Sequence, residues 1–302
     1  MSGISTNRTN ISLPTDIAQE VLQKTQGASA IMRLARQINL PGRGLTIPVI
    51  TGDPEAAWVA ETGKKPVSNP GLSQKIMQAY KLAVIVPFSD EFRRDLAALY
   101  DALVERLPGA LALKFDQTVI GAVDAPGENF DTFAAATGQS IVAASNYTAY
   151  TGLVAAYADI ANHNGALSGF GLSPAAKGIL LSAVDSDGRP LFINSAAEGA
   201  PDRLLGVGAI EGRGLYKAGV AAVGTAAGTP AVVGVAGDWT QAVWGTVEGV
   251  QIRFADQTGL TIGTEQVNLW EHNMFAVRAE IEVGFRADVN CFNKLLGAVP
   301  TT

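Results

Sequence analysis

Residues 56–74, AAWVAETGKKPVSNPGLSQ, lie in the part of the chain that decides the fold. Gly, Pro, Asn and Ser are too frequent there for a packed helix or strand, so we predict a long projecting loop. A long helix should follow between residues 89 and 121, because apolar residues recur every three or four positions. These positions are Phe92, Leu96, Leu99, Leu103, Leu107, Leu111 and Phe115. Pro108 is expected to kink this helix, and a break near residues 95–98 is equally allowed.

Two apolar runs flank the loop, LTIPVI at residues 45–50 and KIMQAYKLAVIVPF at residues 75–88. We predict that they pair as a two-stranded ribbon, which is marginal alone and needs another surface to pack on. Upstream, SAIMRLARQINL at residues 29–40 fits both a helical and a two-residue period. We favour a strand there, because the turn residues PGRG follow it directly.

The rest of the chain alternates short helices with strands, which predicts an α+β fold. Helices are expected near residues 15–27, 148–164 and 175–184. Residues 218–237 are long enough to cross a membrane, but they consist of Ala, Gly, Val and Thr with one proline, Pro230. We therefore predict strands and turns for them, with no membrane contact.

The clearest strand comes last, because its apolar and charged residues alternate. One side carries Phe275, Val277, Ala279, Ile281, Val283 and Phe285, and the other carries Arg278, Glu280, Glu282 and Arg286. The first face should be buried, and the second should face water.

The length, net charge and cysteine content of the chain limit the classes of protein to which it can belong. The chain has 302 residues, of which 47% are hydrophobic, enough for about two domains of roughly 150 residues. A formal net charge of -6 argues against a surface built to hold nucleic-acid phosphates. Cys291 is the single cysteine and cannot form an intramolecular disulfide, which is compatible with a reducing cytoplasm. The first ten residues, MSGISTNRTN, lack the apolar core of a signal peptide, so export by that route is not expected.

No pattern of residues points to catalysis, a cofactor or a metal. His163 and His272 have no zinc-binding spacing and are expected to be surface or capping residues. Residues 185–188, DSDG, resemble the start of a calcium loop, but Ala196 stands where the bidentate glutamate is required, so a β-turn is favoured. The glycines at residues 206–214 do not form a dinucleotide-binding motif, and no nucleophile motif is present. We therefore predict a protein that is not an enzyme.

The order of several segments resembles the major capsid proteins of tailed bacteriophages. The segments are AAWVAETGKKPVSNPGLSQ, KLAVIVPFSDEFRRD, LYDALVERLPGALALKFDQTVIGA, SPAAKGILLSAVDSDGRPLF, DRLLGVGAI, VAGDWTQAVWGTVEGVQIRF and FAVRAEIEVGFRADVNCFNKLLG. The resemblance implies four parts of one fold, which encapsulin shells also use. These are an N-terminal arm (1–44), an extended loop (45–86), a peripheral domain with a spine helix (87–145 and 266–302) and an axial domain (146–265).

The function that this resemblance implies is structural. The chain would assemble into pentamers and hexamers of an icosahedral head that encloses double-stranded phage DNA without sequence-specific contacts. Assembly would take place in the host bacterial cytoplasm, and the product would be part of the virion. A portal, a scaffolding protein, a protease and a decoration protein are the further partners implied. The alternative is an encapsulin-like compartment shell that holds an enzyme cargo.

The resemblance also implies which residues contact neighbouring subunits. Trp58 and Val59 would be apolar anchors, and Glu61, Lys64, Lys65, Arg93 and Arg94 would be charges at the rim of the contact. Packing of Trp58 within its own subunit and plain solvation of the lysines are the alternatives. Axial loops near residues 185–190 and 208–214 would point toward the ring centres. Some family members join subunits by an isopeptide bond, for which Lys64 or Lys65 with Asn290 or Asn293 are the candidates here.

Overall fold

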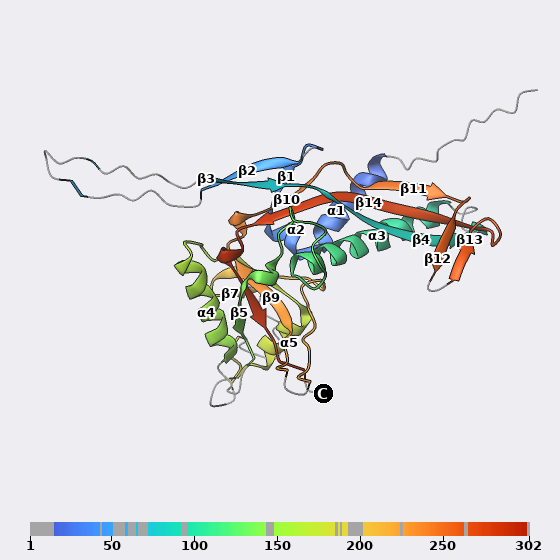
Figure 1. Cartoon of the computed structure of the whole chain (residues 1–302). Helices are drawn as coiled ribbons and strands as arrows, with labels where there is room; N and C mark the ends of the chain where they lie inside the picture. Colours follow the sequence, from blue (N-terminus) through green and yellow to red (C-terminus); the bar gives the residue numbers. More distant parts are fainter. Residues whose placement is uncertain are drawn as a thin grey trace, which may run out of the picture.

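The computed structural model of the chain describes a defined subset of its residues. They are residues 15–42, 44–50, 58–59, 65, 72–91, 96–142, 148–184, 187, 189–192, 202–223, 226–262 and 265–300. The described chain forms an elongated upper part, a lower lobe that holds the C-terminus, and a thin ribbon that extends away from both (Figure 1). No helix among these residues is long and apolar enough to cross a membrane.

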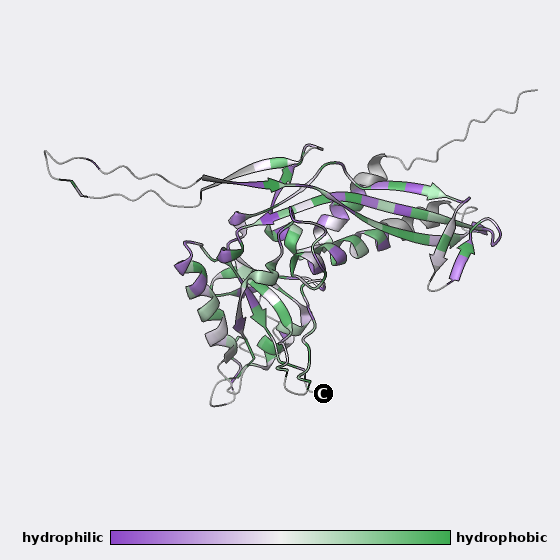
Figure 2. Cartoon of the chain, viewed as in Figure 1, coloured by the Kyte–Doolittle hydropathy of each residue, from purple (hydrophilic) through white to green (hydrophobic). Residues whose placement is uncertain are grey.

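The upper part is built around one long strand, β14 (Met274–Ala287). It pairs antiparallel with β10 (Ala242–Thr246), β11 (Gln251–Ala255) and β4 (Tyr80–Ser89). Hydrophobic and hydrophilic residues alternate along β14 in Figure 2. Val277, Ala279 and Ile281 are buried, while the charged residues between them are half-buried. The predicted alternation is therefore confirmed, with the exception of Arg286, which was expected on the wet face but is only 8% exposed.

The spine helix α3 (Leu96–Val119) packs against this sheet. Leu107, Leu111 and Phe115 are buried, as the predicted stripe requires. The helix is one piece across Pro108. Residues 92–95, where the expected helix would begin, lie outside the described residues, as does the outcome of the alternative break there.

The N-terminal segment differs from the prediction. Helix α1 (Thr15–Ala28) is found as expected, but residues 29–40 are not one strand. They form a short helix α2 (Ala30–Leu34) followed by strand β1 (Arg36–Asn39), which pairs in parallel with β10. The reason is a helix cap: the Ser29 hydroxyl oxygen accepts a hydrogen bond from the Met32 N–H, which favours the helical alternative for the first half.

The ribbon is also shorter than predicted. Strand β2 (Leu45–Ile50) pairs antiparallel with β3 (Leu72–Met77), but the run 75–88 does not continue as one ribbon strand. It is interrupted at residues 78–79, and β4 then joins the large sheet beside β14. Leu82, Val84 and Val86 of β4 pack against the core under that sheet. Burial of this alternating face outweighs continued pairing in an isolated ribbon.

The lower lobe contains a sheet in the order β5-β15-β9-β6-β8-β7. Its strands are β5 (Thr137–Ser140), β15 (Phe292–Leu296), β9 (Val232–Gly237), β6 (Gly169–Leu172), β8 (Val207–Glu211) and β7 (Arg203–Leu204). Helices α4 (Thr148–Asn162) and α5 (Pro174–Ser182), both expected from sequence, share an apolar core with this sheet.

Shorter elements complete the chain, and aromatic residues join its two parts. The shorter elements are the 3-10 helices η2 (Phe133–Ala135), η3 (Trp239–Gln241) and η4 (Val289–Cys291), and the hairpin of β12 (Gly259–Ile262) with β13 (Glu265–Asn268). Phe133 lies between Phe285 of β14 and Phe292 of β15, with ring centroids 5.7 and 4.6 Å away. One buried cluster therefore spans the upper part and the lower lobe.

Candidate functional site

At the base of the ribbon, two glycines lie so close to main-chain carbonyl oxygens that no side chain would fit at either position. Gly44 has a φ of +84°, and a Cβ there would lie 2.8 Å from the Met77 carbonyl oxygen. A Cβ at Gly284 of β14 would lie 2.6 Å from the carbonyl oxygen of Gln78. Both contacts are shorter than real Cβ atoms show, so glycine is required at both positions. The base of the ribbon therefore lies directly on β14.

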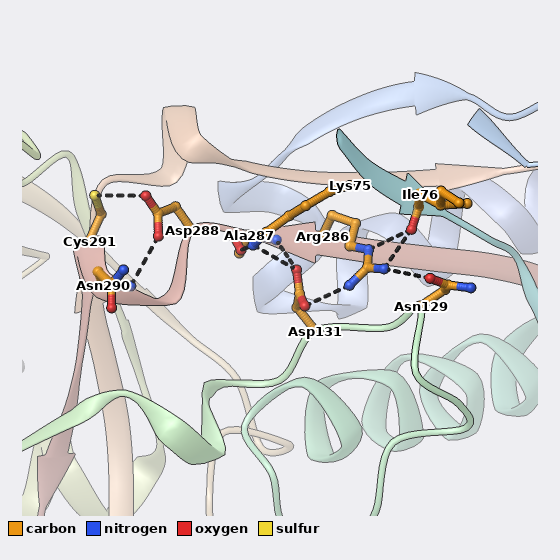
Figure 3. A network of polar contacts seen from close by, with 9 residues as sticks. All are labelled: Lys75, Ile76, Asn129, Asp131, Arg286, Ala287, Asp288, Asn290 and Cys291. Carbon is orange, nitrogen blue, oxygen red and sulfur yellow. Dashed lines mark hydrogen bonds and ion pairs between the residues drawn. The ribbon is translucent and has the colours of Figure 1, made fainter. Parts of the chain in front are cut away.

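Arg286 of β14 fixes the ribbon at this point (Figure 3). Its guanidinium donates from Nε and Nη2 to the Ile76 carbonyl oxygen of β3, at 2.8 and 2.6 Å. Nη1 contacts Asp131 Oδ1 at 2.7 Å, and Nη2 donates to Asn129 Oδ1 at 2.9 Å. The planar guanidinium can hold all three acceptors at once because its donors point in fixed directions.

Asp131 completes the network from the connection that follows α3. Its Oδ2 accepts a hydrogen bond from the Ala287 N–H at 3.1 Å and lies 3.6 Å from Lys75 Nζ. Lys75 also donates to the Ala287 carbonyl oxygen at 3.0 Å. Two cations, one carboxylate and several main-chain groups thus join β3, β14 and the connection after α3. We call Lys75, Asn129, Asp131 and Arg286 the ribbon clamp.

A small apolar cluster, separate from the larger cores, includes the end of the ribbon strand β3. Leu40, Met77 and Val243 are buried in it, and Met77 is fully buried. Met77 is the last residue of β3, so the base of the ribbon is held by apolar contact as well as by charge. The direction of the ribbon is therefore set by the body of the subunit.

The chain continues from the ribbon clamp into the lower lobe. Asp288 Oδ1 accepts a hydrogen bond from the Asn290 N–H at 3.3 Å, and Asp288 Oδ2 lies near Cys291 Sγ (Figure 3). Burial, with the nearby carboxylates of Asp288 and Asp238, raises the pKa of the Cys291 thiol to about 11. The thiol is therefore protonated at neutral pH and is not a nucleophile.

A second buried carboxylate, Asp116 of α3, joins the spine helix to the N-terminal segment. It is 1% exposed and accepts hydrogen bonds from the Ser29 hydroxyl at 2.5 Å and from the Ala30 N–H at 3.0 Å. Gly212 and Gly214 pack against it from the lower lobe. Burial raises its pKa from the ordinary 3.8 to about 6, although these hydrogen bonds oppose the shift.

We expect this carboxyl to make the subunit more stable at pH 5 than at pH 7.5. Between 3.8 and about 6 the folded chain binds a proton that the unfolded chain does not, so stability is lost as the pH rises through this window. Because pH 5 already lies above 3.8, only the interval from pH 5 to about 6 contributes, so the difference in the free energy of unfolding is on the order of 1.4 kcal/mol. Urea unfolding of wild type and Asp116→Asn at both pH values measures it. The advantage of wild type over Asp116→Asn should grow as the pH falls, and a constant difference would contradict the expectation.

The residues predicted to contact neighbours are only partly described. The side chain of Trp58 is 105% exposed, Val59 is 39% exposed, and Lys65 is exposed as well. Glu61, Lys64, Arg93 and Arg94 lie outside the described residues. The alternative in which Trp58 packs within its own subunit does not fit this exposure.

The two asparagines proposed for a crosslink have different surroundings. Asn290 is exposed, whereas Asn293 is fully buried and donates to Asp159 Oδ2 at 2.9 Å. Asn293 is therefore not accessible to a lysine of another subunit in this structure. Its side chain belongs to the core of the lower lobe.

The structure describes both histidines and part of the DSDG turn, so their predicted surroundings can be compared with it. His163 and His272 are at the surface, as predicted. Among the residues that the structure describes, no group of three or more His, Cys, Asp or Glu side chains could hold a metal ion. Of the DSDG turn, only Asp187 is described.

A two-stranded ribbon beside a two-part body, with an exposed tryptophan beyond the end of β2, is compatible with a subunit of a larger protein assembly. A model of the phage capsid family matches residues 10–289, and the chain belongs to this family. The chain is 32% identical to the probable major capsid protein gp17 of Mycobacterium phage L5, over 94% of this chain and 88% of that protein. It is 28% identical to the gp17 of Mycobacterium phage D29, over 95% of this chain and 90% of that protein.

Solved structures agree with the predicted α+β capsid fold. A chain of Gordonia phage Cozz superposes with a TM-score of 0.68 at 22% identity, covering 90% of this chain and 87% of that one. The capsid of a native GTA particle, computed with C5 symmetry, gives a TM-score of 0.62 at 16% identity and covers 99% and 96%. The protein is a structural subunit of a phage capsid that self-assembles into a shell and is located in the virion.

Proposed function

We propose that the chain forms the wall of an icosahedral head around double-stranded phage DNA and that the ribbon binds a neighbouring subunit. The observation that carries this proposal is the full exposure of Trp58 beyond the end of β2. An indole has a large apolar surface, so burial of Trp58 against a neighbouring subunit would stabilise the contact. The ribbon clamp sets the direction of the ribbon, so a neighbouring subunit can bind it in a defined position.

The proposed contact has an apolar centre and a charged rim. Trp58 and Val59 form the centre, and Glu61, Lys64, Lys65, Arg93 and Arg94 form the rim. Charges at a rim contribute mainly to specificity and register. We retain the division of the chain into four parts as part of the proposal. These parts are the N-terminal arm (1–44), the extended loop (45–86), the peripheral domain (87–145 and 266–302) and the axial domain (146–265). Strand β4 belongs by its pairing to the large sheet instead of the ribbon.

Further partners belong to the same proposal. We infer assembly in the host bacterial cytoplasm, with a portal, a scaffolding protein, a protease and a decoration protein as candidate partners. The net charge of -6 favours a wall that holds DNA without adsorbing it. The relatives named above carry phage capsid names, which leaves the encapsulin-like alternative without support.

Electron microscopy of the purified protein tests the proposal. Closed shells are expected, and particles recovered from phage-producing cells should contain DNA protected from nuclease. A compact single-chain species at high concentration, or shells that hold an enzyme in place of DNA, would contradict it.

A second experiment tests the possible crosslink: boiling the same particles in detergent separates a crosslinked wall from a non-covalent one. Asn290→Ala is the matched control, since Asn290 is the exposed one of the two candidate asparagines.

A further inference from the structure

The hairpin of β7 and β8 has an unusual residue at its turn. Leu204 pairs with Val207, so only Leu205 and Gly206 connect the two strands. Both residues have a positive φ, +50° for Leu205 and +84° for Gly206. Asn-Gly is strongly preferred in a two-residue turn of this kind, because a left-handed backbone brings Cβ close to the following carbonyl oxygen and asparagine tolerates this best. Leu205 therefore strains the turn.

Neither the backbone nor the core of the subunit explains a leucine at this position. Among the residues that the structure describes, the other two non-glycine residues with positive φ are both asparagines, Asn164 and Asn273. The side chain of Leu205 is 40% exposed and belongs to none of the buried clusters. Strain that is retained without burial indicates that the side chain has a role outside its own subunit.

Helix α4 lies on the outside of the lower lobe (Figure 1) and has an uncharged outer face. Tyr150, Val154 and Tyr157 share that face, because they are four and three residues apart, and they are 50%, 38% and 53% exposed. The single charged residue of α4 is Asp159, which accepts a hydrogen bond from the buried Asn293 of the lobe. Surface helices normally carry charged residues opposite their buried stripe, so this face is expected to be covered in the assembly.

The strained turn and the uncharged helix face lie at opposite edges of the lower lobe. The order of the sheet places β5 at one edge and β7 at the other. Helix α4 packs beside β5, where Gly152 allows it to approach the Ser140 carbonyl oxygen closely. The turn with Leu205 lies at the β7 edge. In a closed ring of identical subunits, one side of each subunit contacts the opposite side of the next, so an apolar projection and an uncharged face at opposite edges suit such a contact.

We propose that Leu205 of one subunit packs against Tyr150, Val154 and Tyr157 of α4 in a neighbouring copy. This inference rests on the proposed function, because it needs rings of this chain, and it names the residues that determine how two adjacent lobes fit together. Aromatic side chains bury a large apolar area against a projecting leucine and need no charge pair for the contact. The leucine thus stabilises the assembly at a cost to the isolated subunit.

Paired cysteines test the proposed contact directly. In assembled particles, Leu205→Cys combined with Val154→Cys and treated with a short bismaleimide should give a ladder of linked chains up to the number of copies in a ring, because the contact runs head to tail. Each single variant, and dispersed subunits of the double variant, should stay single chains. Leu205→Cys combined with Ile85→Cys is the matched control, since Ile85 is 47% exposed but lies on β4 of the upper part. Wild type controls for Cys291, which is buried.

A substitution at the turn tests the cost to the isolated subunit. Leu205→Asn relieves the strain, so its equilibrium constant of unfolding in urea should be about fivefold lower than that of wild type. Its yield of particles should nevertheless be roughly tenfold lower, because the apolar contact is lost. Normal assembly of Leu205→Asn, an unfolding constant that does not fall, or no ladder from the double variant in intact particles would overturn the inference. If wild type itself forms no shell, the proposed function fails instead.

Discussion

Deletion of residues 51–69 is expected to abolish shell formation while the subunit still folds. The deletion joins Ile50 to Leu72 through two residues, and these strand ends are already paired in register. A two-residue connection is the shortest that an antiparallel hairpin uses. Of the removed residues that the structure describes, Trp58, Val59 and Lys65, none belongs to the four buried clusters, so the body should keep its stability. Circular dichroism and thermal unfolding check the fold, and electron microscopy checks assembly.

A single substitution within this segment should weaken assembly without abolishing it. Trp58→Ala removes a fully exposed indole, and an anchor of this kind contributes on the order of 2 kcal/mol per contact. The concentration needed for assembly should then rise about 30-fold. Trp58→Phe keeps an aromatic ring and should recover most of the loss. Normal particles from the deletion variant would refute the role of the loop.

Arg286→Met is expected to have the largest effect on stability. It leaves Asp131 without its strongest partner and the Ile76 carbonyl oxygen without two hydrogen bonds. The side chains of Arg286 and Asp131 are only 10% and 18% exposed, so water cannot fully replace the lost contacts. Removing one partner of a buried ion pair typically costs about 3 to 5 kcal/mol, and partial exposure favours the lower end. Urea unfolding measures the change.

Matched variants separate the pair from the rest of the ribbon clamp. Arg286→Lys keeps the charge but loses the planar geometry, so it should recover only part of the stability. Combining Arg286→Met with Asp131→Asn should destabilise less than the sum of the two single changes, because the two side chains share one interaction. Lys75→Met should have a smaller effect, since its side chain is 37% exposed. An unchanged urea midpoint for Arg286→Met would show that the clamp does not hold the ribbon base.

Much of the fold follows from local patterns. The alternation from Phe275 to Phe285 predicted β14, and the repeat of Leu107, Leu111 and Phe115 predicted α3. Both signals are strong because each element buries one continuous face over many residues. The projecting loop predicted at residues 56–74, from its many Gly and Pro residues, stays a prediction, because the structure describes only residues 58–59, 65 and 72–74 of it.

Sites that depend on contacts between distant segments could not be predicted from local sequence patterns. Arg286 occupies a position that the alternation assigns to solvent, and it is buried only because β3 and the connection with Asp131 cross over it. Asn293 and Asp116 are buried for the same kind of reason. Ser29 was a local signal, since it caps a helix, but the two-residue period of the following strand obscured it.

The sequence by itself determined the long elements, above all α3 and β14, because a hydrophobic period repeated over many residues is a strong local signal, but it assigned the short helix α2 to a strand. Only the tertiary structure decided where the ribbon ends and which charges are buried. These features depend on which distant backbone groups meet. A local pattern contains no information about that, since burial and hydrogen bonding depend on the partner as much as on the residue.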